Sequence, residues 1–447
     1  MANSKYINRK TNIQLIIRKN EIELVGLLCL MIFSFISTVT LVVSLIILLV
    51  LLTQKEIGAV KIINIITFRS IINPGVAISI SNSQNLKWII LFGCSFYLMF
   101  AYFKLGNNEL KKIKSILFLV ILFGFYNIFV AFKFSSLPIV ATTKLLSYIV
   151  IFIGTMIGIG YTYRKFDWIK WLLQLFSILI IVSFFMIRLP VSYLRNGYSF
   201  QGITNHPNMF GMVPPIFLAL ILSYKQLNKN FNKIYIFFMI PITMYMVILS
   251  KSRTSFISCI ILLSVYIAFL NIEIVHKILI NIMLFISIIT IAVTNNRILK
   301  GIFDFLYKGQ NQGGILDSRQ EQINIYLSNI VRSPWFGNGF AVPVLPFKSF
   351  VFSSEYVVEP GNLVLAVLSY CGMFGFLIFL TYIINIFFVN KKNFRYVCFL
   401  PLSAILISMG EMVFFSSNNN GIWCYMMMSI YIFTNRPNNG LGSDNSV

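Results

Sequence analysis

Two basic residues occur in a short polar turn, Ser250 to Ser255, between the apolar runs at 233–249 and 254–270. An ionisable residue between two runs long enough to cross a bilayer suggests a function by default. The planar guanidinium of arginine can also bind two phosphate oxygens at once. The turn therefore predicts anion binding by Arg253, with Lys251 as a further substrate-binding residue. The alternative is that both side chains extend along apolar surface toward lipid phosphates.

A second polar cluster, residues 202–208, comes directly before the apolar run at 208–223. Pro207 suits the first position of a helix because it has no amide hydrogen to lose there, and it holds His206 extended. We expect His206 to act as a base or as a hydrogen-bond donor to sugar, and Asn208 to bind substrate. The alternative is that His206 only caps the helix.

A third cluster lies in the long polar segment 295–358. Ser318 and Glu321 have the spacing of a capping box, and apolar residues follow at helical spacing: Ile323, Leu327, Ile330 and Val331. The pattern predicts an amphipathic helix at about 319–332. A cation such as Arg319 in its first turn opposes the helix dipole unless an anion is bound there. The alternative is an ion pair with a neighbouring carboxylate.

The residue types argue against several other kinds of site. The chain has four aspartates with no DxD arrangement, so a metal-clamped nucleotide-sugar site is poorly supported. It has no Gly-Lys dipeptide and hence no P-loop, which argues against ATP-driven transport. The two histidines lie far apart and the six cysteines form no CxxC pair, so the cysteines are expected to pack as apolar side chains. We therefore expect no metal and no other cofactor.

The elements that must position these residues are membrane helices. Hydrophobic residues make up 58% and charged residues 11% of the 447 residues, unlike a soluble protein. The bilayer core accepts each run of roughly 20 apolar residues as a helix. We predict an all-α, polytopic transmembrane protein with about twelve spans. The expected spans are 24–52, 86–103, 115–131, 138–160, 168–187, 208–223, 233–249, 254–270, 275–294, 360–389, 396–414 and 421–435.

Lysine and arginine are unevenly distributed between alternate loops. If the N-terminus is cytoplasmic, most of them fall in cytoplasmic segments and few in the short outer loops. The net charge of +23 then belongs to loops between spans and gives no reason to expect nucleic acid. We expect a multi-pass protein of the plasma (inner) membrane with both termini cytoplasmic.

The first apolar run, 24–52, is too long for the core of a signal peptide and is expected to be a retained anchor. It is also longer than the hydrocarbon core is thick. It therefore either tilts or breaks near Ser37, Thr38 and Thr40 into a hairpin paired with a second span at 57–80.

The chain is predicted to form one integral membrane domain, 1–447. Its large extracytoplasmic loop, 295–358, carries the short amphipathic helix. This loop and the outer loops at 188–207 and 250–253 offer the polar material for a site. Arg195, in the loop at 188–207, is a further candidate for substrate binding.

Short motifs follow one another in the second half of the chain. They are Asn205-His206-Pro207-Asn208, the turn at 250–253, Arg319, Pro334-Trp335-Phe336-Gly337-Asn338-Gly339, Asn362 and Gly372-Met373-Phe374-Gly375. Their order around one large outer loop resembles the O-antigen ligase and polymerase superfamily. The resemblance covers about residues 195–380.

This resemblance implies a GT-C-like membrane glycosyltransferase that acts without metal on polyprenyl-pyrophosphate-linked glycans outside the cytoplasm. Arg253 and Arg319 match the pyrophosphate-binding arginines of the family. Ligases carry histidine directly before the asparagine that Asn362 matches, whereas this chain has glycine there. We therefore expect a polysaccharide polymerase, with Glu359 or His206 as the base. Asn362 is expected either to bind sugar or to hold the loop.

The expected polymerase joins lipid-linked repeat units of O-antigen, capsule or another exopolysaccharide, with a flippase and a chain-length regulator as candidate partners. One alternative is an O-antigen ligase that transfers the glycan to a lipid A core or protein. A different class is a lipid-linked oligosaccharide flippase, but such transporters usually have two similar halves and charges near the bilayer midplane. Here Lys144 and Glu411 are the evident charges inside the spans. They are expected to form a structural pair or to line a cavity.

Overall fold

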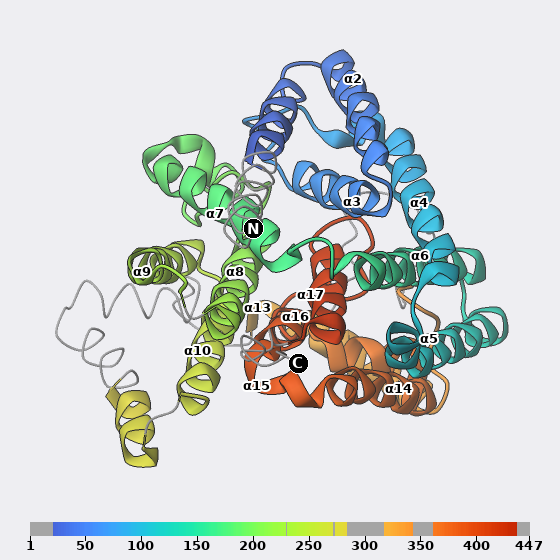
Figure 1. The fold of residues 1–447 in the computed structure, drawn as a ribbon. Helices are drawn as coiled ribbons and strands as arrows, with labels where there is room; N and C mark the ends of the chain where they lie inside the picture. The colour runs from blue at the N-terminus through green and yellow to red at the C-terminus, as the bar shows by residue number, and fades with distance from the viewer. Residues whose placement is uncertain (1–20, 229, 271–272, 284–316, 343–360, 436–447) are drawn as a thin grey trace, which may run out of the picture.

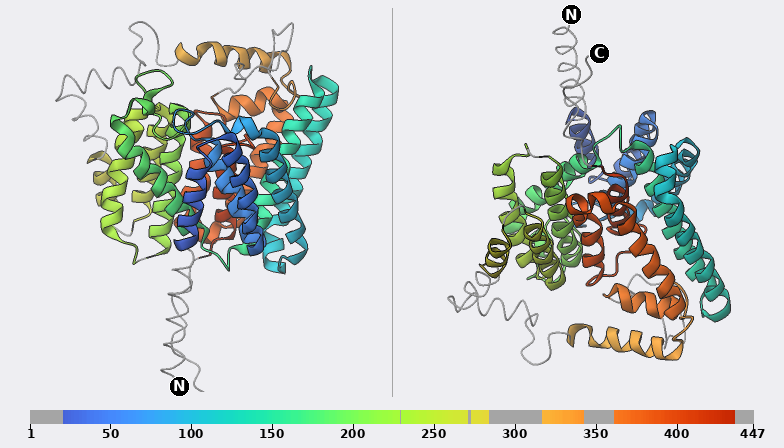
Figure 2. Two further views of the ribbon diagram at one scale, coloured as in Figure 1. Left: turned by 90° about the horizontal axis from the view of Figure 1, so that it is seen from above. Right: turned by 60° about the horizontal axis from the view of Figure 1, so that its bottom comes forward.

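The computed structural model describes residues 21–228, 230–270, 273–283, 317–342 and 361–435 (Figure 1). These residues are helical apart from turns and one isolated β-bridge between Ile72 and Thr204, which confirms the all-α class. Most helices run side by side as a bundle, and α13 (Asp317–Arg332) lies across one end of it (Figure 2). We refer to the end that contains His206 as the His206 end and to the opposite one as the Lys104 end.

Seven described helices are long and apolar enough to cross a bilayer, so the chain is a multi-pass membrane protein. They are Ile80–Lys104 (η2 Ile80–Ser83, α4 Gln84–Phe100 and η3 Ala101–Lys104), Asn107–Phe134 (α5), Pro138–Thr162 (α6), Trp168–Arg188 (α7 Trp168–Phe185 with η4 Met186–Arg188), Pro207–Leu227 (α8), Lys233–Ser250 (α9) and Leu363–Val389 (α14). The shorter apolar helices are Thr38–Gln54 (α2 Thr38–Leu48 with η1 Leu49–Gln54), Arg253–Ala268 (α10), Ile274–Met283, Phe399–Ser408 (α16) and Gly421–Phe433 (α17). The count of twelve spans and the extent of the loop at 295–358 stay predictions.

The first apolar run forms a hairpin and not a single tilted span. A helix at residues 21–33 is followed by a turn, and α2 with η1 then returns along it. Ser37 caps α2 by accepting a hydrogen bond from the Thr40 amide at 3.2 Å, because a hydroxyl can satisfy one of the free amides of a helix start. Of the two sequence alternatives, the break near Ser37 is the one observed.

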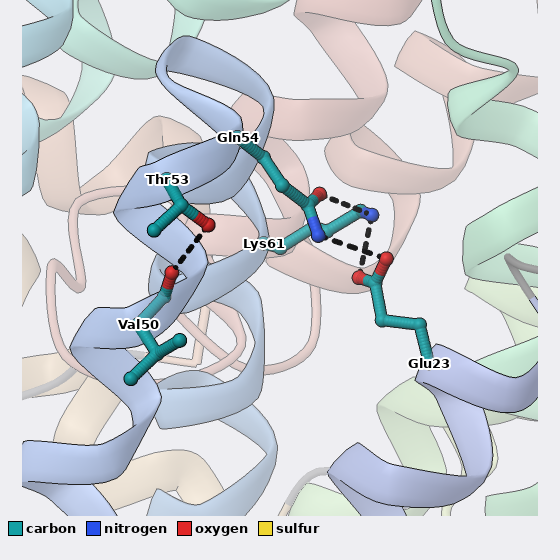
Figure 3. A network of polar contacts seen from close by, with 5 residues as sticks. All are labelled: Glu23, Val50, Thr53, Gln54 and Lys61. Carbon is teal, nitrogen blue, oxygen red and sulfur yellow. Dashed lines mark hydrogen bonds and ion pairs between the residues drawn. The ribbon is translucent and has the colours of Figure 1, made fainter.

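A buried polar network closes the open ends of this hairpin against α3 (Glu56–Ser70). Lys61 Nζ donates to Glu23 Oε1 at 2.6 Å and to Gln54 Oε1 at 2.9 Å, and Gln54 Nε2 donates to Glu23 Oε2 at 2.9 Å (Figure 3). The Lys61 side chain is only 2% exposed, and such a charge needs partners because its desolvation is costly. The two arms of the hairpin and α3 make three passes in place of the one expected span. Because three is an odd number, the expected sidedness of the later helices is unchanged.

Helix α8 lies at the centre of the half of the bundle that carries the candidate residues. Every residue from Phe210 to Ser223 is buried, and α7, α9, α10 and α16 pack around it. Pro214 and Pro215 lie inside this helix, which runs unbroken from Pro207. Prolines are tolerated in a membrane helix where neighbouring protein covers the freed backbone groups.

Helix α14 is interrupted at Gly372, which has φ 62° and ψ −168°. The break frees backbone groups on both sides, and the segment 334–339 satisfies them. The amides of Met373 and Phe374 donate to the carbonyls of Pro334 and Trp335, at 2.8 and 3.2 Å. In return, the carbonyls of Ser369 and Tyr370 accept from the amides of Asn338 and Gly339, both at 3.0 Å.

This interlock leaves no room for a side chain at Gly372. A Cβ there would lie 2.3 Å from the carbonyl carbon of Trp335, and one at Gly337 would lie 2.5 Å from the backbone of Tyr370. The two glycine-containing motifs of the sequence are thus halves of one structural joint. Their role is to fix the C-terminal end of α13, which begins two residues before the predicted 319.

Segments expected on the same side of the membrane meet at the same end of the bundle. At the Lys104 end, Lys104 pairs with Glu56 at 2.7 Å and Arg164 with Glu109 at 2.6 Å. At the His206 end, the backbone of Asn73 and Asn205 joins the loop after α3 to the loop before α8. The grouping agrees with the charge pattern, and which end faces outward stays a prediction.

Candidate functional site

Three segments converge at the His206 end: the first turn of α8, the turn at 250–255 and residues 409–411 after α16. Asn208 Nδ2 in α8 donates to Glu411 Oε1 at 2.8 Å. Gly410 packs directly on Thr254. A Cβ added to this glycine would lie only 2.1 Å from Thr254 Oγ1. We call His206, Asn208, Arg253 and Glu411 the His206 cluster, which contains three of the eight residues predicted for the site.

His206 has the geometry expected from Pro207. Its backbone is extended, with φ −154° and ψ 143°, and Pro207 takes the first helical position. His206 Nδ1 accepts the Asn208 amide hydrogen at 3.0 Å, so the neutral ring carries its proton on Nε2. In this state Nε2 can donate a hydrogen bond but cannot accept a proton. The geometry therefore favours the cap and a donor role for His206 over the base.

Glu411 belongs to this cluster, although the sequence did not predict it as a site residue. Its half-buried carboxylate is held by Asn208, near the N-terminus of α8, where the helix dipole favours negative charge. Glu411 and Lys144 were expected to form a structural pair or to line a cavity, and Lys144 donates to the carbonyl of Ala341 at 2.7 Å. Within the described residues these two do not form an ion pair. The signal for Glu411 was a lone acid within an apolar run.

Arg253 stands at the first position of α10, directly after the N-cap residue Ser252, and is half-buried. Backbone amides at a helix start and a guanidinium beside them can bind the same anion. The turn is held against α8 at Gly211, where a Cβ would lie 2.5 Å from Ser252 Cβ. Ser252 and Ser255 are joined by a hydrogen bond of 2.7 Å between their hydroxyls.

Lys251 faces the loop at 188–207. It ends α9 in a left-handed conformation, with φ 54°, and its Nζ lies 4.7 Å from the centre of the Tyr198 ring. A cation over an aromatic face is attracted by the electrons of the ring. Arg195 lies in the same loop and is exposed, with its backbone amide donating to Gln201 Oε1 at 3.1 Å. These two cations are near the rim of the site.

The three remaining candidates lie along the polypeptide that leads to α14. Arg319 belongs to α13, but its side chain lies outside the described part of the structure, as does the whole of Glu359. Asn362 caps α14, with its Oδ1 accepting the amides of Val364 and Leu365 at 2.9 and 3.1 Å. The contact shows Asn362 as a helix cap, and its two expected roles, binding sugar or holding the loop, stay predictions.

Within the described residues, no three His, Cys, Asp or Glu side chains gather as they would around a metal ion. The His206 cluster contributes one carboxylate, one imidazole, one amide and one guanidinium. Such a set can donate hydrogen bonds to hydroxyls, bind an oxyanion and accept one proton. These are the elementary steps of group transfer from a phosphorylated donor.

The fold defines a multi-pass membrane protein, and the His206 cluster gathers polar and charged side chains at one end of it. The family model described as O-Antigen ligase matches residues 234–380. The match places this segment in the O-antigen ligase and polymerase superfamily and confirms the resemblance. It includes α9, the turn with Arg253, α10, α13 and the joint between 334–339 and Gly372. None of the curated proteins compared with the chain matches it.

A cavity of about 930 Å³ lies at the Lys104 end and is lined by residues 163–169, 226–228 and 434–435, with Ile159, Tyr224, Asn230 and Ile430. Its lining includes Arg164 and Asp167, and burial raises the pKa of Asp167 although its carboxylate also caps α7. None of the lining residues falls within 234–380. The cavity is also at the end opposite to the His206 cluster, so we do not place the site there.

Proposed function

We propose that the protein is a polysaccharide polymerase that joins polyprenyl-pyrophosphate-linked repeat units at the outer face of the plasma membrane. The observation that carries this proposal is the convergence of Arg253 and the Asn208–Glu411 pair on one end of the bundle. Arg253 belongs to the segment that matches the O-antigen ligase family. The site therefore combines a group for a diphosphate with groups for a sugar hydroxyl.

In the proposed reaction, the bond between the anomeric carbon of the donor glycan and its phosphate oxygen breaks. The electron pair leaves with the polyprenyl diphosphate, and a hydroxyl oxygen of the second repeat unit forms the new glycosidic bond. Arg253 stabilises the charge on the departing diphosphate, and one well-placed donor of this kind is worth about 10² to 10³ in rate. Arg319 is proposed as the second arginine at the same diphosphate.

The proton of the acceptor hydroxyl passes to a carboxylate, and we assign this role to Glu411. Asn208 orients Glu411 through Oε1, and a positioned base contributes about 10² to 10⁴ in rate. Glu359 is the alternative base. His206 donates from Nε2 to a sugar or phosphate oxygen, since its Nδ1 is engaged in the helix cap.

Glycine at the position before Asn362 favours a polymerase over a ligase, because the matching position in ligases carries the histidine on which they rely. A ligase would use the same donor and the same leaving group with another acceptor. A flippase would move the lipid-linked glycan without breaking any bond. The three functions therefore differ in their products.

The test is to incubate the purified protein in lipid nanodiscs with polyprenyl-diphosphate-linked repeat units and to separate the products by size. A ladder of longer lipid-linked glycans is expected, with polyprenyl diphosphate released once for each bond formed. The ladder should persist in EDTA. Transfer that occurs only when a lipid A core is added would identify a ligase. No change in glycan length, with the lipid-linked unit moved across vesicle membranes, would identify a flippase.

A further inference from the structure

Helix α13 has two apolar faces. On the side toward α14, Tyr326 is 6% exposed and its ring contacts that of Tyr370 at 6.5 Å between centres. On the other side, Leu327 is 46% and Val331 80% exposed. Helical spacing predicted an amphipathic helix from Ile323, Leu327, Ile330 and Val331, and the helix is present. Its side toward α14 is centred on Tyr326, which leaves Leu327 and Val331 exposed.

The exposed face continues beyond the end of α13 into Trp335, which is 58% exposed. The rings of Trp335 and Phe336 lie 5.5 and 5.6 Å from that of Phe374 in α14. Phe336 also stacks on Phe134 at 4.9 Å. Phe134 is the last residue of α5, and Phe374 follows the break in α14, so these rings join the end of α5 to the break in α14.

From these rings toward the Lys104 end, α5 and α14 expose large apolar side chains along their length. On α5 these are Phe118, Phe125, Phe129 and Phe132, and on α14 they are Leu377, Leu380, Ile384 and Phe388. Because both helices are long enough to cross a bilayer, this surface faces lipid. Trp335 is thus continuous with the lipid-facing surface and lies at its edge, where tryptophan is favoured in membrane proteins.

The exposed face of α13 changes character along the helix. Asn324, Leu327 and Val331 share one face by helical spacing, and all three are exposed. The face is apolar only in the C-terminal half, next to Trp335 and the lipid-facing surface. Farther toward the N-terminus, the same face carries Asn324.

We propose that the C-terminal half of α13 docks on the bilayer, with Leu327, Val331 and Trp335 in the lipid interface at the His206 end. The N-terminal half then stays in water. The bilayer surface sets the height and tilt of α13 and, through them, the position of Arg319. This inference stands on burial and on continuity with the lipid-facing surface, and it does not depend on the proposed reaction.

The experiment uses spin labels on the full-length protein in phospholipid nanodiscs, with exposed Cys29 changed to serine. The test site is Val331→Cys, the matched control is Asn324→Cys on the same face, and the lipid reference is Phe125→Cys. Collision rates with oxygen and with a water-soluble nickel chelate are measured at each site. The label at 331 should resemble the one at 125, with nickel access severalfold lower than at 324.

Nickel access at 331 equal to that at 324 would overturn the proposal. Spectral broadening at 331 that disappears on dilution with unlabelled protein would assign this face to a second copy, which also overturns it. A second measurement avoids the cysteine variants. The fluorescence present in the native protein and missing in Trp335→Phe should be quenched by lipids brominated near the headgroup. If that fraction is not quenched, Trp335 is not in the interface.

Discussion

The two ends of the bundle differ in the charge pairs that their described residues form. At the Lys104 end, three cations pair with carboxylates, Lys61 with Glu23, Lys104 with Glu56 and Arg164 with Glu109, while Lys112 donates to the carbonyl of Ile432. At the His206 end, three basic side chains have contacts with neutral groups among the described residues. Arg69 donates to the hydroxyl and carbonyl of Ser34 and to the carbonyl of Ile78, Lys144 donates to the carbonyl of Ala341, and Lys251 lies over the Tyr198 ring.

This difference separates charges that hold the structure from charges that can act on a ligand. A cation paired with a carboxylate adds little net field and mainly joins two helices. A cation held by carbonyls or a ring keeps its full charge, and an anion nearby is then strongly favoured. The diphosphate of a lipid-linked glycan is such an anion. The contrast predicts that substitutions at the His206 end change activity and those at the Lys104 end change stability.

The comparison fails entirely if the His206 end faces the cytoplasm. Ser328 in α13 and Asn108 in α5 are both exposed and neutral and lie at opposite ends. Ser328→Cys should react with a membrane-impermeant thiol reagent in intact cells or spheroplasts, and Asn108→Cys only after lysis. In intact cells or spheroplasts, each cysteine is expected either to react or not to react. The reverse pattern would invert the orientation and move the reaction to the other face.

The largest effect on the rate is expected at Arg253. Arg253→Ala should abolish long polymer, a loss of at least about 10² to 10³ in rate, while Arg253→Lys should retain partial activity because it keeps the charge and loses the planar fork. The matched control is Arg164→Ala at the Lys104 end, which should leave the polymer unchanged. Product ladders from purified proteins in nanodiscs measure both.

Arg319 offers a sharper form of the same test. If both arginines act on one leaving group, the Arg253→Ala, Arg319→Ala double variant should be little worse than the worse single variant. Full-length polymer from Arg319→Ala at normal protein levels would reduce Arg319 to a local ion pair. Arg253 would then be the sole arginine proposed for the diphosphate.

Glu411→Gln should come next, with a loss of about 10² or more if this carboxylate is the base. Glutamine keeps an oxygen that can accept from Asn208, so the fold should be retained. The rate of Glu411→Gln should also lose the acid limb of its pH dependence, whereas Asn208→Ala should lower the rate less and keep that limb. An unchanged pH profile in Glu411→Gln, with a small loss of rate, would return the role of the base to Glu359.

Gly372→Ala tests the joint that holds α13. Alanine would have to adopt the positive φ of Gly372, and its Cβ would lie 2.3 Å from the backbone of Trp335, which costs about 1 to 3 kcal/mol or disconnects the joint. We expect faster proteolysis in α13 and a reduced rate. Gly93→Ala is the control, since a Cβ at Gly93 in α4 meets nothing within 4 Å. Equal protease resistance in the two variants would contradict the joint.

Local features of this structure were predictable from the sequence. The start of α8 follows from Pro207, the helix at α13 from its apolar spacing, and the break near Ser37 from excess length and hydroxyl residues. Each depends on neighbours within one or two turns. The match of residues 234–380 to the O-antigen ligase family likewise follows short motifs whose order is visible in the chain.

The contacts that assemble the site were not predictable in this way. Asn208 and Glu411 are 203 residues apart, and no local sequence pattern near either residue predicts their contact. The break at Gly372 lies within a continuous apolar run and becomes understandable only when segment 334–339 is placed beside it. The side of α13 that packs on α14 also depends on these tertiary contacts. Tertiary hydrogen bonds decide which of two similar helix faces is buried, and hydrophobic spacing alone does not distinguish them.

The smallest effect is expected at the Lys104 end, for Glu56→Gln. Burial alone would raise the pKa of Glu56, but the hydrogen bond from Lys104 and the charges of Lys104 and Lys165 outweigh it, so the pKa is lowered. A carboxylate whose pKa is lower in the folded state adds stability above its unfolded pKa, and this contribution is lost as the pH falls through the folded value. The native protein should therefore lose thermal stability on acidification below about pH 4.3.

Glu56→Gln should be less stable than the native protein at neutral pH and should lose less thermal stability on acidification, while its polymer ladder stays unchanged. A shortened ladder from Glu56→Gln would show that the Lys104 end also contributes to the reaction, and the division between the two ends would then be wrong.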